Sequence, residues 1–98
     1  MEYEVRQSKI FSKWFSKLKD SVAKLAIARR LVRLEDGNFG DSKSVGEGVF
    51  ELRIDVSKGY RVYFSNKENK IIILLVGGDK STQKEDIKTA KKMAKEIG

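Results

Sequence analysis

Two short runs of alternating charged and apolar residues carry the side chains best suited to hold an anion. Glu51 and Arg53 alternate with apolar residues in the first run, and Arg61 and Tyr63 do so in the second, after a turn at 57–59. Side chains on a strand point to opposite faces in turn, so all four share one face if the strands pair as a hairpin. Guanidinium groups on such a face can bind a phosphate. The same alternation is typical of the solvated face of a half-buried hairpin, and the pattern leaves both interpretations open.

A second candidate site follows the most apolar stretch of the chain. Lys80 and Ser81 come after the glycine pair Gly77 and Gly78 and lead into an expected helix. Glycines, a lysine and a helix N-terminus together favour an anion. The stretch is not a Walker phosphate-binding loop, because Asp79 stands where that pattern requires glycine. An ordinary strand-to-helix turn with an exposed lysine fits these residues equally well.

The overall charge also favours an anionic partner. The 98 residues include 21 Lys and Arg against 14 Asp and Glu, which gives a formal net charge of +7. This balance favours nucleic acid first and an acidic protein second. A lysine-rich surface that serves solubility alone is the alternative.

The residue types that are missing exclude several kinds of chemistry. The chain has no cysteine and no histidine, which removes disulfides, thiolate chemistry, the usual zinc sites and imidazole-based triads. The longest apolar run, 71–76, is too short to span a bilayer, and the N-terminus has no signal-peptide pattern. We expect one cytoplasmic domain over residues 1–98, with no membrane contact, no metal and no cofactor.

Hydrophobic periodicity predicts the order strand, helix, helix, strand, strand, strand, helix. Residues 1–7 alternate as a short strand. Ser8 can cap a first helix that ends near Lys19, and Asp20 can cap a second helix from Ser21 to Leu34. We expect the two helices to pack as a hairpin on one face of an antiparallel sheet, which makes an α+β fold.

The second helix has an apolar side and a basic side. Its expected buried stripe consists of Val22, Leu25, Ala28, Leu31 and Val32. Near its C-terminus, where cations suit the helix dipole, the outer side is expected to carry Arg29, Arg30 and Arg33. These arginines form either a phosphate-contacting patch or an ordinary solvated face.

The rest of the chain is predicted to form a loop, the hairpin, a buried strand and a last helix. The glycine-rich stretch 39–48 is expected to be a loop, with room for a very short strand around Lys43 to Val45. The run 71–76 does not alternate, which suggests a strand buried on both faces. Thr82 and Glu85 have the spacing of a capping box and are expected to open the last helix.

Several short motifs, in this order and spacing, resemble the RelE/ParE superfamily of bacterial toxins from type II toxin–antitoxin modules. Within it the chain looks like the HigB-like group, in the branch called addiction module killer proteins. The resemblance extends from Phe11 to Ala94. It is carried by Arg30–Leu31 with Leu34, Gly37 to Asp41, Gly48 to Ile54, Gly59 to Phe64, and Gly77 to Gln83 with Asp86–Ile87. It implies the same core that the periodicity predicts.

The resemblance implies arrest of translation. RelE-like members bind in the ribosomal A site and cut mRNA without metal, through attack of the ribose 2′-hydroxyl on the adjacent phosphate. At matching positions, Arg53 and Arg61 would clamp the scissile phosphate. Lys80 would donate a charge or a proton, and Glu51 would act as the base. The residues expected to contact RNA are Lys43, Tyr63, Gln83 and Lys84, together with Arg29 and Arg33.

The chain also departs from the family pattern. Several relatives have a histidine or a tyrosine near the site, whereas here Gln83 and a lysine-rich helix follow the last strand. No acid or base of near-neutral pKa is evident. A ParE-like toxin that binds DNA gyrase is the alternative, as is an inactive nucleic-acid-binding relative. Either toxin interpretation implies a cognate antitoxin, typically a helix-turn-helix protein that contributes acidic side chains.

Overall fold

The computed structural model describes residues 3–97 and has five strands and three α-helices in that range. The strands are β1 (Glu4–Gln7), β2 (Ser42–Gly46), β3 (Val49–Ile54), β4 (Tyr60–Lys67) and β5 (Ile71–Asp79). The helices are α1 (Lys9–Lys17), α2 (Ser21–Glu35) and α3 (Gln83–Ile97), and a 3-10 turn, η1, spans Lys80–Thr82. The predicted α+β class and element order are confirmed, including the very short strand in the loop.

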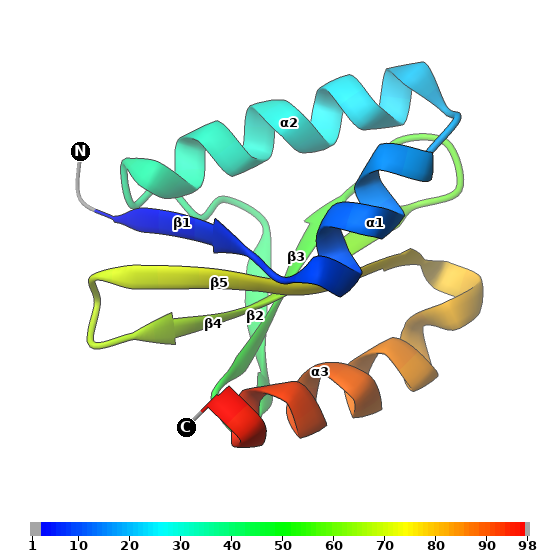
Figure 1. The fold of residues 1–98 in the computed structure, drawn as a ribbon. Coiled ribbons are helices and arrows are strands. Elements are labelled where there is room, and N and C mark those ends of the chain that lie inside the picture. Colours follow the sequence, from blue (N-terminus) through cyan, green and yellow to red (C-terminus); the bar gives the residue numbers. More distant parts are fainter. Residues whose placement is uncertain (1–2, 98) are drawn as a thin grey trace.

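One sheet, in the order β1-β5-β4-β3-β2, lies between the helices (Figure 1). Helices α1 and α2 cover one face, where the core includes Phe11 and Ile27. Helix α3 covers the other face, where the core includes Tyr63, Leu75 and Ala90. The hairpin face that carries Tyr63 is therefore partly enclosed by α3. Within residues 3–97, no helix has the length and apolar character needed to cross a membrane.

The first strand corrects the prediction of an antiparallel sheet. β1 pairs with β5 in parallel, with Glu4 opposite Ile71 and Gln7 opposite Leu74, while the other neighbouring strands are antiparallel. Such a short strand has no pattern that distinguishes the two directions of pairing. The long connection through both helices and three strands permits the parallel one. Residues 1–2, which were expected in the same strand, lie outside the described residues.

The starts of the three helices agree with the prediction, since α3 begins at Gln83, directly after Thr82, but the capping box before the last helix does not. Ser8 caps α1 and Asp20 caps α2, each through a side-chain oxygen that accepts a backbone N–H. The predicted capping box of Thr82 and Glu85 is wrong, because the box is formed by Asp79 and Thr82 around η1. The 3-10 turn over Lys80–Thr82 thus separates the end of β5 from the start of α3, and Asp79 is the residue that caps it.

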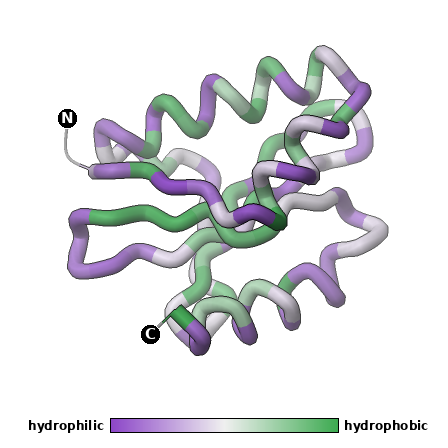
Figure 2. The backbone as a smooth tube through the Cα atoms, in the orientation of Figure 1, coloured by the Kyte–Doolittle hydropathy of each residue, from purple (hydrophilic) through white to green (hydrophobic). Residues whose placement is uncertain are grey.

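Strand β5 continues through the glycine pair at which it was expected to end. Its apolar stretch runs through the middle of the molecule (Figure 2). A Cβ atom at Gly77 would lie 2.3 Å from the ring of Trp14, and one at Gly78 would lie 1.9 Å from the carboxylate of Asp86. The two glycines thus allow α1 and α3 to approach the strand closely, one on each face.

Helix α2 buries a different face from the one predicted. Its buried residues are Ala23, Ile27 and Leu34. In the predicted stripe, by contrast, the exposed fractions are 66% for Val22, 54% for Leu25 and 61% for Val32. Both sets recur at helical spacing, so periodicity alone does not decide which of them faces the sheet.

Candidate anion-binding site

The hairpin of β3 and β4 has the register that places the two arginines together. Arg53 lies directly opposite Arg61, and Glu51 lies directly opposite Tyr63. Residues that are directly opposite in an antiparallel pair project from the same face. The predicted shared face of these four residues is therefore confirmed.

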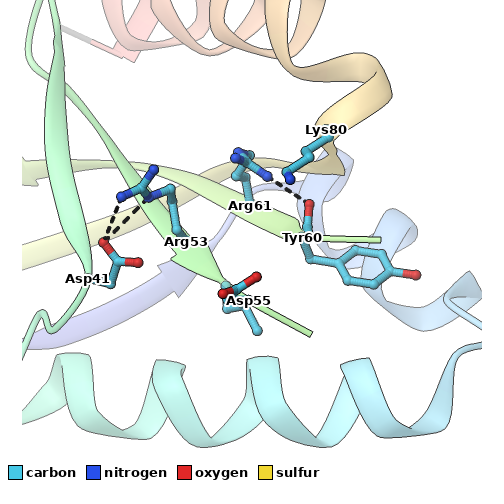
Figure 3. Close-up of a pocket in the computed structure, with 8 residues that line it drawn as sticks. Asp41, Arg53, Asp55, Tyr60, Arg61 and Lys80 are labelled. Atoms are coloured by element: carbon cyan, nitrogen blue, oxygen red, sulfur yellow. Dashed lines mark hydrogen bonds and ion pairs between the residues drawn. The ribbon is translucent and has the colours of Figure 1, made fainter. Parts of the chain in front are cut away.

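A pocket of about 230 Å³ opens where this hairpin meets the end of β5 (Figure 3). Arg53, Arg61 and Lys80 contribute its three cations. The other lining residues are Asp41, Ile54, Asp55, Gly59 and Tyr60. The structure thus brings together the predicted sheet arginines and the lysine after the last strand. The pocket is large enough for a phosphate group with its ester oxygens.

Gly59 explains how two of the cations come to lie side by side. Its φ of +78° is the left-handed conformation that turns β3 into β4. Its carbonyl oxygen accepts a hydrogen bond of 2.8 Å from Nη1 of Arg61. A Cβ atom at this position would lie 3.3 Å from the same nitrogen and 3.2 Å from Cε of Lys80. The side chains of Arg61 and Lys80 therefore both pass over Gly59, which has no side chain.

The third cation is already paired. Nη2 of Arg53 lies 3.3 Å from Oδ1 of Asp41, and both side chains are about half exposed. The backbone N–H of Arg53 also donates to the carbonyl of Asp41, at 2.9 Å. An exposed pair of this kind contributes less than about 1 kcal/mol. A phosphate can therefore replace Asp41 as the partner of Arg53 at little cost.

Arg30 has a structural position that corrects its predicted place on the outer side of α2. Nη1 of Arg30 donates to the carbonyl of Arg53 at 2.6 Å, and Nη2 donates to the carbonyl of Phe39 at 3.0 Å. Arg30 thus joins α2 to β3 and to the loop that carries Asp41. The loss of solvation lowers the pKa of Arg30 from its usual value.

Glu51 lies beneath the pocket and not in its lining, and its exposed fraction is 0%. Its Oε2 accepts hydrogen bonds of 3.0 Å from the Tyr63 hydroxyl and 2.8 Å from Nε2 of Gln83. Nε of Arg61 lies 3.8 Å from the same oxygen. Burial, together with the Glu51 carboxylate, raises the pKa of Tyr63 far above its usual value. Glu51, Tyr63 and Gln83 therefore form a buried polar cluster behind Arg61.

The other residues expected to contact RNA lie outside the pocket. Lys43 is opposite Glu51 on the edge strand β2 and is exposed, and Lys84 is exposed at the start of α3. Arg29 and Arg33 are exposed on α2, on the other side of the sheet. The structure does not bring these four residues together with Arg53, Arg61 and Lys80.

Five of the eight lining residues lie outside the set predicted from the sequence, and three of these five have polar side chains. Asp55 had a usable signal, because the alternation that selects Arg53 continues to it. Tyr60 alternates onto the opposite face, and its ring points away from the cations of the pocket (Figure 3), where its hydroxyl donates to Asp20 at 3.4 Å. Asp41 lies in an irregular loop, and no sequence pattern indicates its contact with Arg53.

The fold and the site together define a small α+β protein with a cationic pocket at one end of its sheet. A family model for phage-derived Gp49-like proteins (DUF891) matches residues 13–96. The chain therefore belongs to the Gp49-like family. A protein of Haemophilus influenzae, described as uncharacterized, is 53% identical over 98 residues, which is 100% of this chain and 99% of the relative.

Solved structures with a similar fold include bacterial toxins. A mutant of the E. coli toxin RelE in the free state has a TM-score of 0.68 and 18% identity, covering 90% of this chain and 97% of RelE. A chain of the intact E. coli RelBE toxin–antitoxin complex has a TM-score of 0.64 and 21% identity, covering 79% of this chain and 95% of that one. The chain thus has the RelE fold.

Proposed function

We propose that this protein is the toxin of a type II toxin–antitoxin module of the HigB-like, addiction module killer type. In this proposal it arrests translation by cutting mRNA on the ribosome. The RelE fold and the net charge of +7 support the proposal. The observation that carries it is the pocket in which Arg61 and Lys80 cross Gly59, next to Arg53.

The reaction requires stabilisation of charge on phosphorus. When a ribose 2′-oxygen attacks the adjacent phosphate, the bond from phosphorus to the 5′-oxygen breaks and a 2′,3′-cyclic phosphate forms. Negative charge builds on the non-bridging oxygens during this step. Arg61, held by its hydrogen bond to Gly59, and Lys80 provide cations for these oxygens, and Arg53 adds a third once the phosphate displaces Asp41.

The 2′-hydroxyl must also lose a proton, and Asp55 is the carboxylate best placed to take it. Among residues 3–97, the carboxylates that line the pocket are Asp41 and Asp55. Asp41 is paired with Arg53, whereas Asp55 is exposed and has no hydrogen-bond or ion-pair partner within that range. The 5′-oxygen takes a proton as it leaves, and the ammonium group of Lys80 is the proton donor that faces the pocket.

In this proposal Glu51 is not the base, although the resemblance implies that role for it. Its fully buried carboxylate accepts from Tyr63 and Gln83 and lies 3.8 Å from Arg61. Glu51 therefore acts as a positioning residue that fixes the guanidinium of Arg61 over Gly59. Substrate does not need to reach it.

Two assays with purified protein test the proposal: cleavage of a short mRNA on programmed ribosomes, and DNA supercoiling by gyrase. We expect cleavage that requires ribosomes, and a loss of at least about 100-fold in the Arg61→Ala variant. The Lys70→Ala variant is the matched control, because it removes one exposed lysine from the β4–β5 turn at the other end of the sheet. Inhibition of supercoiling without any RNA cleavage would contradict the proposal and support the gyrase alternative.

A further inference from the structure

Strand β3 extends past the end of its neighbour β2, and Arg53 lies on this extension. β2 begins at Ser42, which is paired with Leu52, so no residue of β2 is opposite Arg53. The backbone N–H of Arg53 donates to the carbonyl of Asp41, at 2.9 Å, in the loop before β2. The carbonyl of Arg53 points to the same side, as the two backbone groups of a residue do in an antiparallel sheet. It therefore needs a hydrogen-bond donor that no strand supplies.

Arg30 of α2 supplies this donor. Its Nη1 donates to the carbonyl of Arg53 at 2.6 Å. Its Nη2 donates to the carbonyl of Phe39 at 3.0 Å and lies 3.3 Å from the carbonyl of Asp41. The donors of a guanidinium are fixed in one plane, so a single group can hold the strand and the loop in a defined arrangement. Arg30 thus takes the place of a missing strand at the end of β3.

The loop before β2 is shaped around the guanidinium of Arg30. Gly40 has a φ of +60°, and a Cβ atom at this position would lie 3.0 Å from Nη2 of Arg30. The carbonyls of Phe39 and Asp41 can therefore both reach Arg30, because the residue between them has no side chain. Arg30 consequently holds the backbones of both Arg53 and Asp41, whose side chains pair with each other in the pocket (Figure 3).

The contacts of Arg30 depend on its shape more than on its charge. Within residues 3–97 its hydrogen bonds all go to backbone carbonyls, and its side chain does not line the pocket. A lysine at this position would keep the positive charge. Its single nitrogen could not contact the strand and the loop in the same fixed geometry. The substitution Arg30→Lys therefore loosens the end of β3 without changing the net charge.

We propose that Arg30 is a positioning residue that fixes the end of β3, so that Arg53 is held in place when a phosphate displaces Asp41. The proposal rests on the RNA cleavage proposed above. Once the Asp41 carboxylate leaves, Arg53 loses the side-chain partner that it has in the free protein. The backbone contact with Arg30 remains and continues to orient it. Arg61 does not depend on Arg30, because Gly59 and Glu51 hold it from the other side of the hairpin.

A double-mutant cycle between Arg30 and Arg53 tests this role. We expect Arg30→Lys to lower the single-turnover rate of cleavage on programmed ribosomes by about 10-fold, because a small displacement of Arg53 has a large effect on rate. In an Arg53→Ala background the same substitution should lower the rate by less than about 2-fold, since the side chain through which Arg30 acts is absent. Arg6→Lys is the matched control and should keep the wild-type rate. Arg6 is an exposed arginine on β1 that pairs with Glu4.

Thermal unfolding of the same variants distinguishes positioning from a general loss of stability. The carbonyl of Arg53 is a backbone group, so Arg30→Lys should lower the Tm equally with Arg53 and with Ala at that position. The two measurements therefore differ: the effect on Tm is additive, and the effect on cleavage is not. Equal losses of cleavage in both backgrounds would overturn the proposal, because they would show that Arg30 acts through stability alone. Wild-type cleavage by Arg30→Lys would overturn it as well.

A measurement on the free protein separates this proposal from the function on which it rests. The NMR signal of the Nε–H group of Arg53 can be assigned by its loss in Arg53→Ala. We expect this signal to shift in Arg30→Lys and to stay unchanged in Arg6→Lys. An unchanged signal in Arg30→Lys would show that Arg30 does not position Arg53, even if the protein cleaves RNA. A shifted signal in a protein that cleaves no RNA would refute the proposed function and leave the positioning of Arg53 by Arg30 established.

Discussion

Gly59 allows the pocket to be perturbed without removing any charged group. The substitution Gly59→Ala has two separate consequences. A residue with a side chain at a φ of +78° is strained by about 1 kcal/mol or slightly more. The new Cβ atom would also lie 3.2 Å from Lys80 and 3.3 Å from Arg61, so both side chains must move by a few tenths of an ångström.

Gly48 provides a matched control for the strain alone. Its φ is also +78°, but a Cβ atom there has no neighbour within 4 Å. We expect Gly48→Ala and Gly59→Ala to lower the Tm by similar amounts, about 4–8 °C for each kcal/mol in a domain of this size. Only Gly59→Ala should lose RNA cleavage, by about 10- to 100-fold, because small errors in the placement of catalytic groups have large effects on rate.

Thermal unfolding and ribosome-dependent cleavage, measured on the same preparations, test this reasoning. The ratio of the two cleavage rates is the informative quantity, since the strain is common to both variants. Equal cleavage by the two variants would show that the arrangement of Arg61 and Lys80 over Gly59 has no role in the reaction. A large loss of cleavage in Gly48→Ala would point to a general effect of instability.

Three further predictions follow from the pocket and from the buried cluster behind it. If Asp55 is the base, Asp55→Asn lowers the single-turnover cleavage rate by about 100- to 10,000-fold. RNA binding stays equal or tightens, because the substitution removes a negative charge from the pocket. Unchanged cleavage would exclude this role for Asp55. Glu51→Ala lowers the free energy of unfolding by about 3 kcal/mol in urea titrations, because it leaves Tyr63 and Gln83 without their shared buried acceptor and Arg61 without its ion-pair partner. A change below about 1 kcal/mol would show that the cluster contributes little. Because the pKa of Tyr63 is raised on folding, its contribution to stability is complete below the pKa of about 10 of a free tyrosine and is lost as the pH rises above that value. Unfolding measured at pH 8 and above pH 10 should show a smaller decline in Tyr63→Phe than in wild type, and an equal decline in both would contradict this assignment.

Local sequence patterns predicted the hairpin well. Alternation along 50–56 and 60–64 places Arg53 and Arg61 on one face, and the observed register sets them directly opposite each other. The helix caps at Ser8 and Asp20 are equally local, since each depends on a side chain and a backbone N–H three residues later. Alternation and helix caps depend only on neighbouring residues, so they can be predicted without knowing how the rest of the chain folds.

The features that sequence could not predict depend on contacts between distant segments. Helix α2 has two apolar stripes, and only its packing on the sheet decides that Ile27 is buried and Leu25 exposed. Glu51 lies on a face that would be solvated if α3 did not cover it, and α3 supplies Gln83 as its partner. The contact of Asp41 with Arg53 depends on the path of an irregular loop. The resemblance to toxins selects Arg53, Arg61 and Lys80, which line one pocket, but neither of the carboxylates Asp41 and Asp55 that line it with them.

Primer extension on mRNA from cells that briefly express this protein tests directly whether it cleaves mRNA on the ribosome. Wild type and Lys70→Ala should produce discrete new 5′ ends within translated codons, and Arg61→Ala should produce none. This result would place Arg61 in a ribosome-dependent nuclease site. Growth arrest by wild type without any new 5′ ends would contradict the account, and the same 5′ ends in Arg61→Ala would show that the cationic pocket is not the site of cleavage.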